Sequence, residues 1–141
     1  MAGFKFVGFQ EHVEIPEGHS QLAIRQEIKS SLNQDETFSM LSQPELISSW
    51  FVNVISLQTK QGGKLVFKSG ANEQEEGVCL SAVMGREIAL LSNGFGEFRA
   101  KLRLSSDEVF VVVDFKILTD APAQKKVQLE SYISNLKTVL S

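Results

Sequence analysis

The chain has 141 residues, a length that fits one domain with a single hydrophobic core. Hydrophobic residues make up 43% and charged residues 22% of it, as in ordinary soluble globular proteins. The net charge of −3 disfavours non-specific binding to nucleic acid, which needs a basic surface. We therefore expect a globular protein that binds no nucleic acid.

Cys79 is the only cysteine, so no intramolecular disulfide can form, and this fits a reducing compartment. The first residues, MAGFKFVGFQ, contain a lysine and no continuous apolar run, unlike a secretory signal peptide. No window approaches the roughly 18 to 20 apolar residues that a membrane-spanning helix needs. The sequence thus predicts a cytoplasmic protein without a membrane span.

Residues 1–20 are open to two interpretations. Phe4 and Phe6 fall on one face of a short alternating stretch, and Pro16 to His19 then have the composition of a turn. An N-terminal arm and an extra edge strand both fit this pattern. The core is predicted to span residues 22–140.

A half-buried strand is predicted over residues 22–32, because apolar and charged residues alternate there. Two short helices are expected next. Asn33 is followed three residues later by Glu36, and Ser42 by Glu45, which is the spacing of a capping box. Pro44 favours the start of the second helix, because a first-turn residue needs no backbone N–H donor.

Six strands and one long helix complete the predicted order. The strands are expected over residues 52–58, 64–68, 76–84, 87–92, 97–105 and 108–118. Glycine-containing turns and polar loops separate them, which is typical of an antiparallel meander. The helix is expected over residues 122–140 with Asp120 as its cap. Its apolar residues follow the helical repeat: Leu129, Tyr132, Ile133, Leu136 and Leu140.

This order predicts an α+β fold. A sheet of six to seven antiparallel strands has one apolar face to cover, and one long helix is available to cover it. We therefore expect the sheet to curve around the C-terminal helix, with the two short helices after the first strand closing one end. The chain contains no internal repeat or linker, so residues 1–141 are predicted to form a single domain.

Three motifs occur in order along the chain: Pro44-Glu45-Leu46-Ile47 with Trp50-Phe51, then Gly62-Gly63-Lys64-Leu65-Val66-Phe67, then Glu76-Gly77-Val78. In these motifs the chain resembles the START-like (SRPBCC) superfamily, and within it the branch named for the activator of the heat-shock protein 90 ATPase. The resemblance covers residues 22–140 and implies the helix-grip fold. The sequence departs from that branch at residues 84–87, where Met-Gly-Arg-Glu replaces a proline-containing turn.

A curved sheet closed by a helix commonly leaves an apolar cavity, which is a usual site for apolar ligands. Strand parity and the helical repeat predict its lining: Trp50, Leu65, Phe67, Val78, Leu80, Phe98, Leu102, Val111, Val113, Phe115, Leu129, Tyr132, Ile133 and Leu136. These side chains could instead fill a closed core. Tyr132, the only tyrosine, could orient a ligand with its hydroxyl or direct that hydroxyl to solvent.

In the fold that the chain resembles, the first strand pairs with the last, and the last with the one before it. The resemblance therefore implies that the opposite face of the sheet carries a set of cations on adjoining strands: Arg25, Lys29, Arg99, Lys101, Arg103 and Lys116. Glu27 and Asp114 fall among them and partly neutralise their charge. The face therefore fits either a solvated surface with mixed cross-strand pairs or a docking surface for an acidic protein partner.

No catalytic residue, metal ligand or cofactor site is predicted. His12 and His19 have no Cys or Asp at a metal-ligand spacing. Cys79 takes the parity opposite to Val78 and Leu80, and no neighbouring cation would lower its pKa. Gly94-Phe95-Gly96 has neither the lysine nor the helix of a phosphate-binding loop, and it predicts a hairpin turn.

Three functions are therefore considered. The favoured one is a non-enzymatic binding protein that holds a small apolar or amphipathic ligand between the sheet and the last helix. The second is a co-chaperone-like module that binds a protein partner with the outer sheet face, as a monomer or a homodimer. The third is a START-like enzyme of the cyclase or hydrolase type. For catalysis, the inward positions offer few polar side chains beyond Gln26, Ser30 and Tyr132.

Overall fold

The computed structural model of the protein describes residues 17–69 and 73–141. Most of the N-terminal segment for which an arm or an edge strand was predicted lies outside these residues. The described chain forms seven strands and three helices, in the order β1(Ser20–Ser30), α1(Gln34–Ser42), α2(Pro44–Ile47), β2(Asn53–Leu57), β3(Lys64–Lys68), β4(Gln74–Val83), β5(Glu87–Ser92), β6(Gly96–Ser105), β7(Glu108–Thr119) and α3(Pro122–Leu140).

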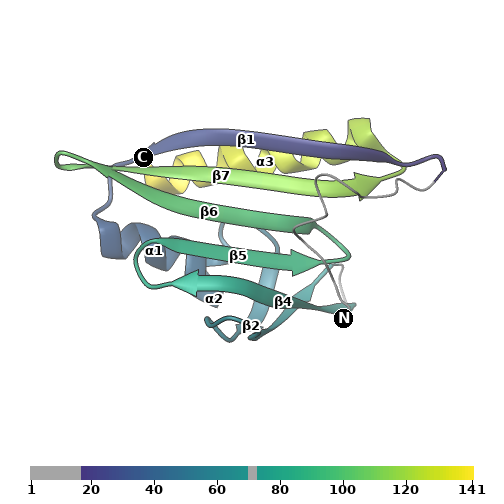
Figure 1. Ribbon diagram of the computed structural model, residues 1–141, viewed down its shortest axis with the longest axis horizontal. Coiled ribbons are helices and arrows are strands. Elements are labelled where there is room, and N and C mark those ends of the chain that lie inside the picture. Colours follow the sequence, from purple (N-terminus) through teal and green to yellow (C-terminus); the bar gives the residue numbers. More distant parts are fainter. Residues whose placement is uncertain (1–16, 70–72) are drawn as a thin grey trace.

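The seven strands form one antiparallel sheet with the order β1-β7-β6-β5-β4-β3-β2. Strand β1 therefore pairs with the last strand, and every other strand pairs with its neighbour in sequence. Figure 1 shows α3 running behind β1 and β7, with α1 and α2 behind the other half of the sheet. The predicted α+β helix-grip arrangement is confirmed.

Helix α3 covers the inner face of the sheet with one apolar stripe. Leu129, Ile133, Leu136 and Leu140 are buried, and Tyr132 is half-buried against the same core. The spacing of these residues places them along one side of the helix, as predicted. The bounds of α3, β3 and β5 agree with the sequence prediction, whereas β1 begins and ends two residues earlier.

The predicted helix caps are confirmed in one of three cases. The Asn33 side-chain oxygen accepts from the backbone N–H of Glu36 at 2.8 Å, and the Glu36 carboxylate accepts from the backbone N–H of Asn33 at 3.2 Å. The prediction of a capping box at Ser42 is wrong, because the Ser42 hydroxyl donates to the Phe38 carbonyl of its own helix at 2.8 Å. Helix α2 instead begins after Gln43, without a side-chain cap.

The cap predicted at Asp120 is also wrong. The N-cap position of α3 is Ala121, which makes no side-chain cap bond. The hydroxyl of Thr119, one residue before Asp120, accepts from the Ala121 backbone N–H at 3.0 Å. Thr119 is buried, so this bond pairs a backbone donor at the junction between β7 and α3.

Strand β4 has the opposite orientation from the prediction. Cys79 is fully buried in the core, whereas Val78 and Leu80 are half-buried and lie outside the core cluster. Cys79 faces inward because it is paired with Leu90, and the pairing with β5 shifts between Cys79 and Ser81. An irregularity of this kind breaks the two-residue repeat on which parity depends. Val78 and Leu80 therefore do not belong to the predicted inner lining.

Candidate functional site

The space between the sheet and α3 is occupied by an aromatic cluster, which we define as Trp50, Phe51, Phe67, Phe95, Phe98, Phe115 and Tyr132. Trp50 stacks on Phe51, with ring centroids 5.2 Å apart and planes inclined by 17°. Phe51 meets Tyr132 edge-on at 4.8 Å, so the rings connect the segment after α2 to α3. Such geometries stabilise aromatic pairs beyond the burial of their area.

Trp50 is an internal anchor of this cluster. Its indole N–H donates to the Met40 carbonyl at 2.7 Å, and the side chain is 1% exposed. The hydrogen bond ties the end of the short helix pair to α1, while the ring packs against Phe98 at 5.6 Å. The sequence prediction placed Trp50 in the lining of a cavity, and its side chain lies within the packed core.

An open groove of about 320 Å³ reaches the cluster at its edge. We call it the mouth groove. Its lining residues come from β3, β4, the turn before β6, α3 and the segment before β2: Val52, Phe67, Lys68, Ser69, Glu75, Gly94, Phe95, Lys125, Gln128 and Tyr132. Its apolar part consists of the half-buried Val52 and Tyr132 and of the nearly buried rings of Phe67 and Phe95, and charged or amide side chains surround it. The groove thus offers an apolar surface beside polar groups.

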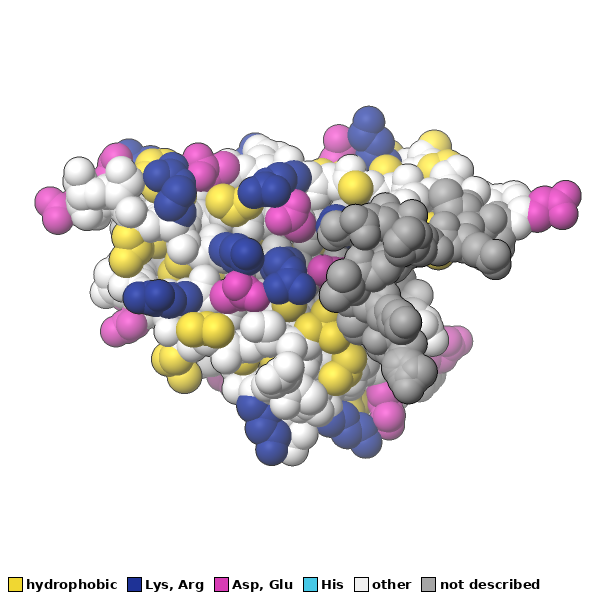
Figure 2. All heavy atoms as spheres, in the orientation of Figure 1, with side chains coloured by type: hydrophobic (Ala, Val, Ile, Leu, Met, Phe, Trp, Pro, Cys, Tyr) yellow, Lys and Arg dark blue, Asp and Glu magenta, His cyan; other side chains and the backbone are white. Residues whose placement is uncertain are grey.

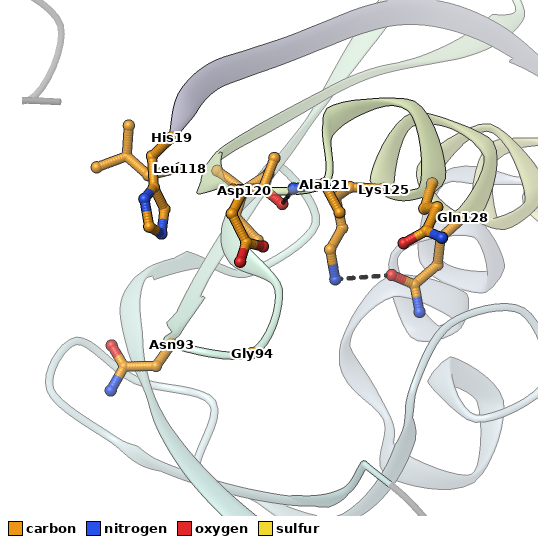
Figure 3. A pocket seen from close by; sticks show the side chains of 11 residues that line it. His19, Asn93, Gly94, Leu118, Asp120, Ala121, Lys125 and Gln128 are labelled. Carbon is orange, nitrogen blue, oxygen red and sulfur yellow. Dashed lines mark hydrogen bonds between the residues drawn. The ribbon is translucent and has the colours of Figure 1, made fainter. Parts of the chain in front are cut away.

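A second opening, of about 560 Å³, lies at the junction between β7 and α3. We call it the polar pocket; Figure 3 shows His19, Asn93 and Asp120 around it and Lys125 and Gln128 on the helix side. The Lys125 ammonium donates to the Gln128 side-chain oxygen at 2.9 Å. Lys125, Gln128 and Gly94 line both the polar pocket and the mouth groove.

Most of the predicted cavity residues lie in the core. The buried ones are Trp50, Leu65, Phe67, Phe98, Val111, Val113, Phe115, Leu129, Ile133 and Leu136, and the partly buried ones packed against them are Leu102 and Tyr132. Phe67 and Tyr132 are the two that also line the mouth groove. Whether the buried residues contact a ligand stays a prediction.

Sequence reasoning missed Val52 and Phe95 as lining residues. Phe95 is 3% exposed although it belongs to the turn between β5 and β6, where its ring lies 5.2 Å from Phe67. A large aromatic residue within the polar, glycine-containing run at residues 93–96 was the available signal, because turn residues are usually small or polar. Val52 gave no such signal.

Tyr132 is the polar group of the aromatic cluster. Burial raises the pKa of its phenol above the ordinary value near 10, because a desolvated site disfavours the charged phenolate. Cys79 shows the same effect: burial raises the pKa of its thiol, and this keeps the side chain neutral. The thiol donates to the Ser81 carbonyl at 3.4 Å, and the prediction of an unreactive strand cysteine agrees with this environment.

Titration of Tyr132 is expected to have a higher midpoint in the folded chain than in the unfolded chain. Above pH about 10 the unfolded chain then binds fewer protons, so the contribution of Tyr132 to the free energy of unfolding falls as pH rises through that window. Tyr132 is the only tyrosine, so phenolate absorbance with and without urea measures both midpoints. Equal midpoints would contradict the half-buried placement.

The other polar residues predicted to face inward are engaged or distant from the groove. The Ser30 and Thr37 hydroxyls are hydrogen-bonded to each other at 2.7 Å, and both residues are buried. Gln26 is half-buried on β1, opposite Val113. Within residues 17–69 and 73–141, no group of three or more His, Cys, Asp or Glu side chains is placed to hold a metal ion.

The outer face of the sheet carries the predicted cations, and carboxylates lie among them (Figure 2). The Arg103 guanidinium donates to Glu27 at 2.9 Å, and Arg99 donates to Glu87 at 2.7 Å. Lys29 forms an ion pair with Glu108. The Arg103 bond lowers the pKa of the Glu27 carboxyl, since it favours the charged form.

The remaining charges on this face follow the same pattern. Arg25 lies 3.9 Å from Asp114, and Lys101 lies 3.8 Å from Glu87. Lys116 is opposite Glu97 in the pairing of β6 with β7. The outer face is therefore a surface of mixed cross-strand pairs, which was one of the two predicted alternatives. Val78 lies on this face too, in a groove of about 410 Å³ with Leu91 and Leu118.

No protein-family model and no curated protein sequence matches this chain. Several solved structures share its architecture. Protein NE0264 from Nitrosomonas europaea has 17% identity and a TM-score of 0.62, over 89% of this chain and 96% of that one. The Aha1 dimer from Colwellia psychrerythraea has 14% identity and a TM-score of 0.64, over 84% and 96% of the two chains.

CalU16 from Micromonospora echinospora has 18% identity and a TM-score of 0.61, over 84% of this chain and 73% of that one. The chain shares its helix-grip architecture with these structures. At these identities the similarity is one of fold, and it carries no activity from one protein to another. None of the helices formed by the described residues is long and apolar enough to cross a membrane.

Proposed function

We propose that the chain is a non-enzymatic binding protein that holds a small apolar or amphipathic molecule in the mouth groove. The observation that supports this function is the apolar part of the groove, where the half-buried Val52 and Tyr132 lie beside the nearly buried rings of Phe67 and Phe95. These rings belong to the aromatic cluster that joins the sheet to α3, so a ligand in the groove would contact the core directly. The groove volume of about 320 Å³ is within the usual range for small-molecule sites, about 300 to 1,000 Å³.

In the proposed site, the buried residues of the predicted lining form a second layer behind the groove residues. Trp50, Phe98 and Phe115 are each at most 1% exposed, and they pack against Phe51. A ligand therefore meets the groove residues first, and it reaches the buried rings only when the cluster rearranges. The proposed first contacts are Val52 and Tyr132, which are half-buried, whereas Phe67 and Phe95 are 1% and 3% exposed and lie almost wholly within the core.

A panel of small aromatic and aliphatic alcohols, acids and esters is expected to contain compounds that raise the melting temperature. Val52→Phe should weaken the binding of such a compound at least about tenfold, because a ring at this half-buried position occupies the groove. Quenching or enhancement of Trp50 fluorescence provides a second measurement, since Trp50 is the only tryptophan.

Val127→Phe is the matched control for this experiment. Val127 is 67% exposed on α3 and does not line the mouth groove, so the same substitution there should leave binding unchanged. A panel in which no compound raises the melting temperature would contradict the proposed function. Equal binding to the wild type and to Val52→Phe would show that the ligand binds outside the mouth groove.

The protein-interaction alternative has weaker support. The motif resemblance to the activator of the heat-shock protein 90 ATPase and the fold shared with the Aha1 dimer make a homodimer or another protein partner a reasonable second proposal. However, the carboxylates on the outer face offset its cations, so this face lacks the strong single-sign field that steers an acidic partner. We also propose that the protein acts in the cytoplasm.

The enzyme alternative would need a titratable group inside the sheet. Asp114 and Glu97 would have supplied one if they faced inward, but both lie on the outer face, beside Arg25 and Arg99 respectively. Acid–base catalysis depends on such a group within reach of the substrate. We therefore propose binding without a reaction.

A further inference from the structure

The mouth groove and the polar pocket meet at Lys125. This side chain lines both openings and is half-buried between them. On one side lie the rings of Phe67 and Tyr132, and on the other lie His19 and Asp120 from the ends of β1 and β7 (Figure 3). A molecule seated against the rings would therefore place its outer end beside the Lys125 ammonium.

Lys125 keeps hydrogen-bonding capacity for such a molecule. Its Nζ donates to the neutral side-chain oxygen of Gln128 at 2.9 Å, and an ammonium carries three N–H donors. The Gln128 amide, oriented by that bond, presents its own NH₂ group as a further donor. Lys125 and Gln128 are three residues apart on α3 and thus occupy the same side of the helix.

The charges around the mouth groove favour a ligand with one negative charge. Lys68 and Lys125 line it together with a single carboxylate, that of Glu75, while the Asp120 carboxylate lies in the polar pocket on the other side of Lys125. The net charge of this lining is therefore positive by one. A second negative charge on the ligand would add repulsion from Glu75, which disfavours a phosphate monoester relative to a monoanion.

We propose that the ligand is a small amphipathic carboxylic acid, bound as its anion. Its apolar part lies against Val52 and Tyr132, above the nearly buried Phe67 and Phe95, and its carboxylate accepts hydrogen bonds from Lys125 and Gln128. This inference rests on the proposed function and adds the chemical class of the ligand. Bonds from an ammonium to a carboxylate are stronger than bonds between neutral groups, so a carboxylate ligand should be preferred over the matching alcohol.

The test uses two compounds that share one ring system, naphthaleneacetate and naphthaleneethanol, with the full chain in isothermal titration calorimetry. The wild type is expected to bind the acid about five- to tenfold more tightly than the alcohol, as for a partly exposed charged hydrogen bond. Lys125→Gln should remove this preference by weakening the acid alone. Lys125→Arg should retain most of it, because the positive charge stays in place.

Lys126→Gln is the matched control. Lys126 is exposed on the adjacent position of α3 and lines neither the mouth groove nor the polar pocket, so its loss should leave the preference unchanged. Lys126→Gln removes one positive charge, as Lys125→Gln does, so it controls for the long-range attraction between the protein and an anion. A melting curve of each variant without ligand shows that the fold is retained.

Each outcome separates this inference from the function on which it rests. Equal binding of acid and alcohol, or a preference that survives in Lys125→Gln, would overturn the carboxylate assignment and leave ligand binding intact. Failure of both naphthalene compounds to bind the wild type would also overturn it. If, in addition, no compound of the panel raised the melting temperature, the proposed function would fail as well.

Discussion

Phe98→Ala is expected to lower the free energy of unfolding by about 3 to 5 kcal/mol, the usual cost of truncating a fully buried phenylalanine. Phe98 is 0% exposed and contacts three other rings of the cluster. Its centroid lies 5.0 Å from that of Phe115, 5.4 Å from that of Phe51 and 5.6 Å from that of Trp50. Removing the ring leaves a cavity that these large side chains can fill only in part.

Phe110→Ala provides a matched control for this prediction. Phe110 lies on the neighbouring strand β7 but on the outer face, half-buried, with the Arg103 guanidinium 4.3 Å from its ring centroid. Its truncation should cost about 1 kcal/mol, because a surface cation–π contact and partial burial are lost without a cavity. Urea unfolding followed by Trp50 fluorescence measures both variants. Equal losses would contradict the assignment of inner and outer faces.

Gly96→Ala is expected to be comparably severe, although it adds a single methyl group. Gly96 has a backbone φ of +76°, a conformation that costs other residues about 1 to 3 kcal/mol. An added Cβ would also lie 2.2 Å from the Lys116 carbonyl oxygen and 2.8 Å from the Ile117 Cβ. Displacing the backbone of β7 should add about 1 to 3 kcal/mol, as other overpacked sites do.

Gly62→Ala isolates the conformational part of that cost. Gly62 has a similar φ of +80°, but no heavy atom lies within 4 Å of the position of its Cβ. The expected loss is therefore about 1 to 2 kcal/mol, from the left-handed backbone conformation alone. Thermal or urea unfolding compares the two variants. A Gly96→Ala variant as stable as Gly62→Ala would show that β6 and β7 do not approach as closely as described.

The order and extent of the elements could be predicted because they depend on local periodicity. Alternation along β6 and β7 and the helical repeat of α3 each arise from one continuous segment that buries one face. The capping box at Asn33 was predictable for the same reason, since both of its partners lie within four residues. Ser42 and Asp120 carry suitable side chains, but Ser42 bonds to its own helix, and the chain enters α3 one residue later.

Strand β4 shows where the local pattern becomes insufficient. Val78, Cys79 and Leu80 are consecutive apolar residues, so either parity could face the core. The pairing of Cys79 with Leu90 and the irregularity before Ser81 settle the orientation, and both depend on β5. Gly77 also lies opposite Leu65, where a Cβ would meet the Leu91 carbonyl at 2.4 Å, so the two neighbouring strands fix its place.

The order of strands and helices in this chain could be predicted from its residues alone, because local turn residues separate the strands and the long helix shows its own repeat in the sequence. The mouth groove could not. It forms where a ring from a turn, a ring from β3 and a ring from α3 meet, beside a lysine that the helical repeat places on the polar side. These side chains are distant in the sequence, and their approach depends on how far the sheet curves and where α3 crosses it. No local pattern contains that information, so the tertiary structure was needed to find Lys125 and the opening that it lines.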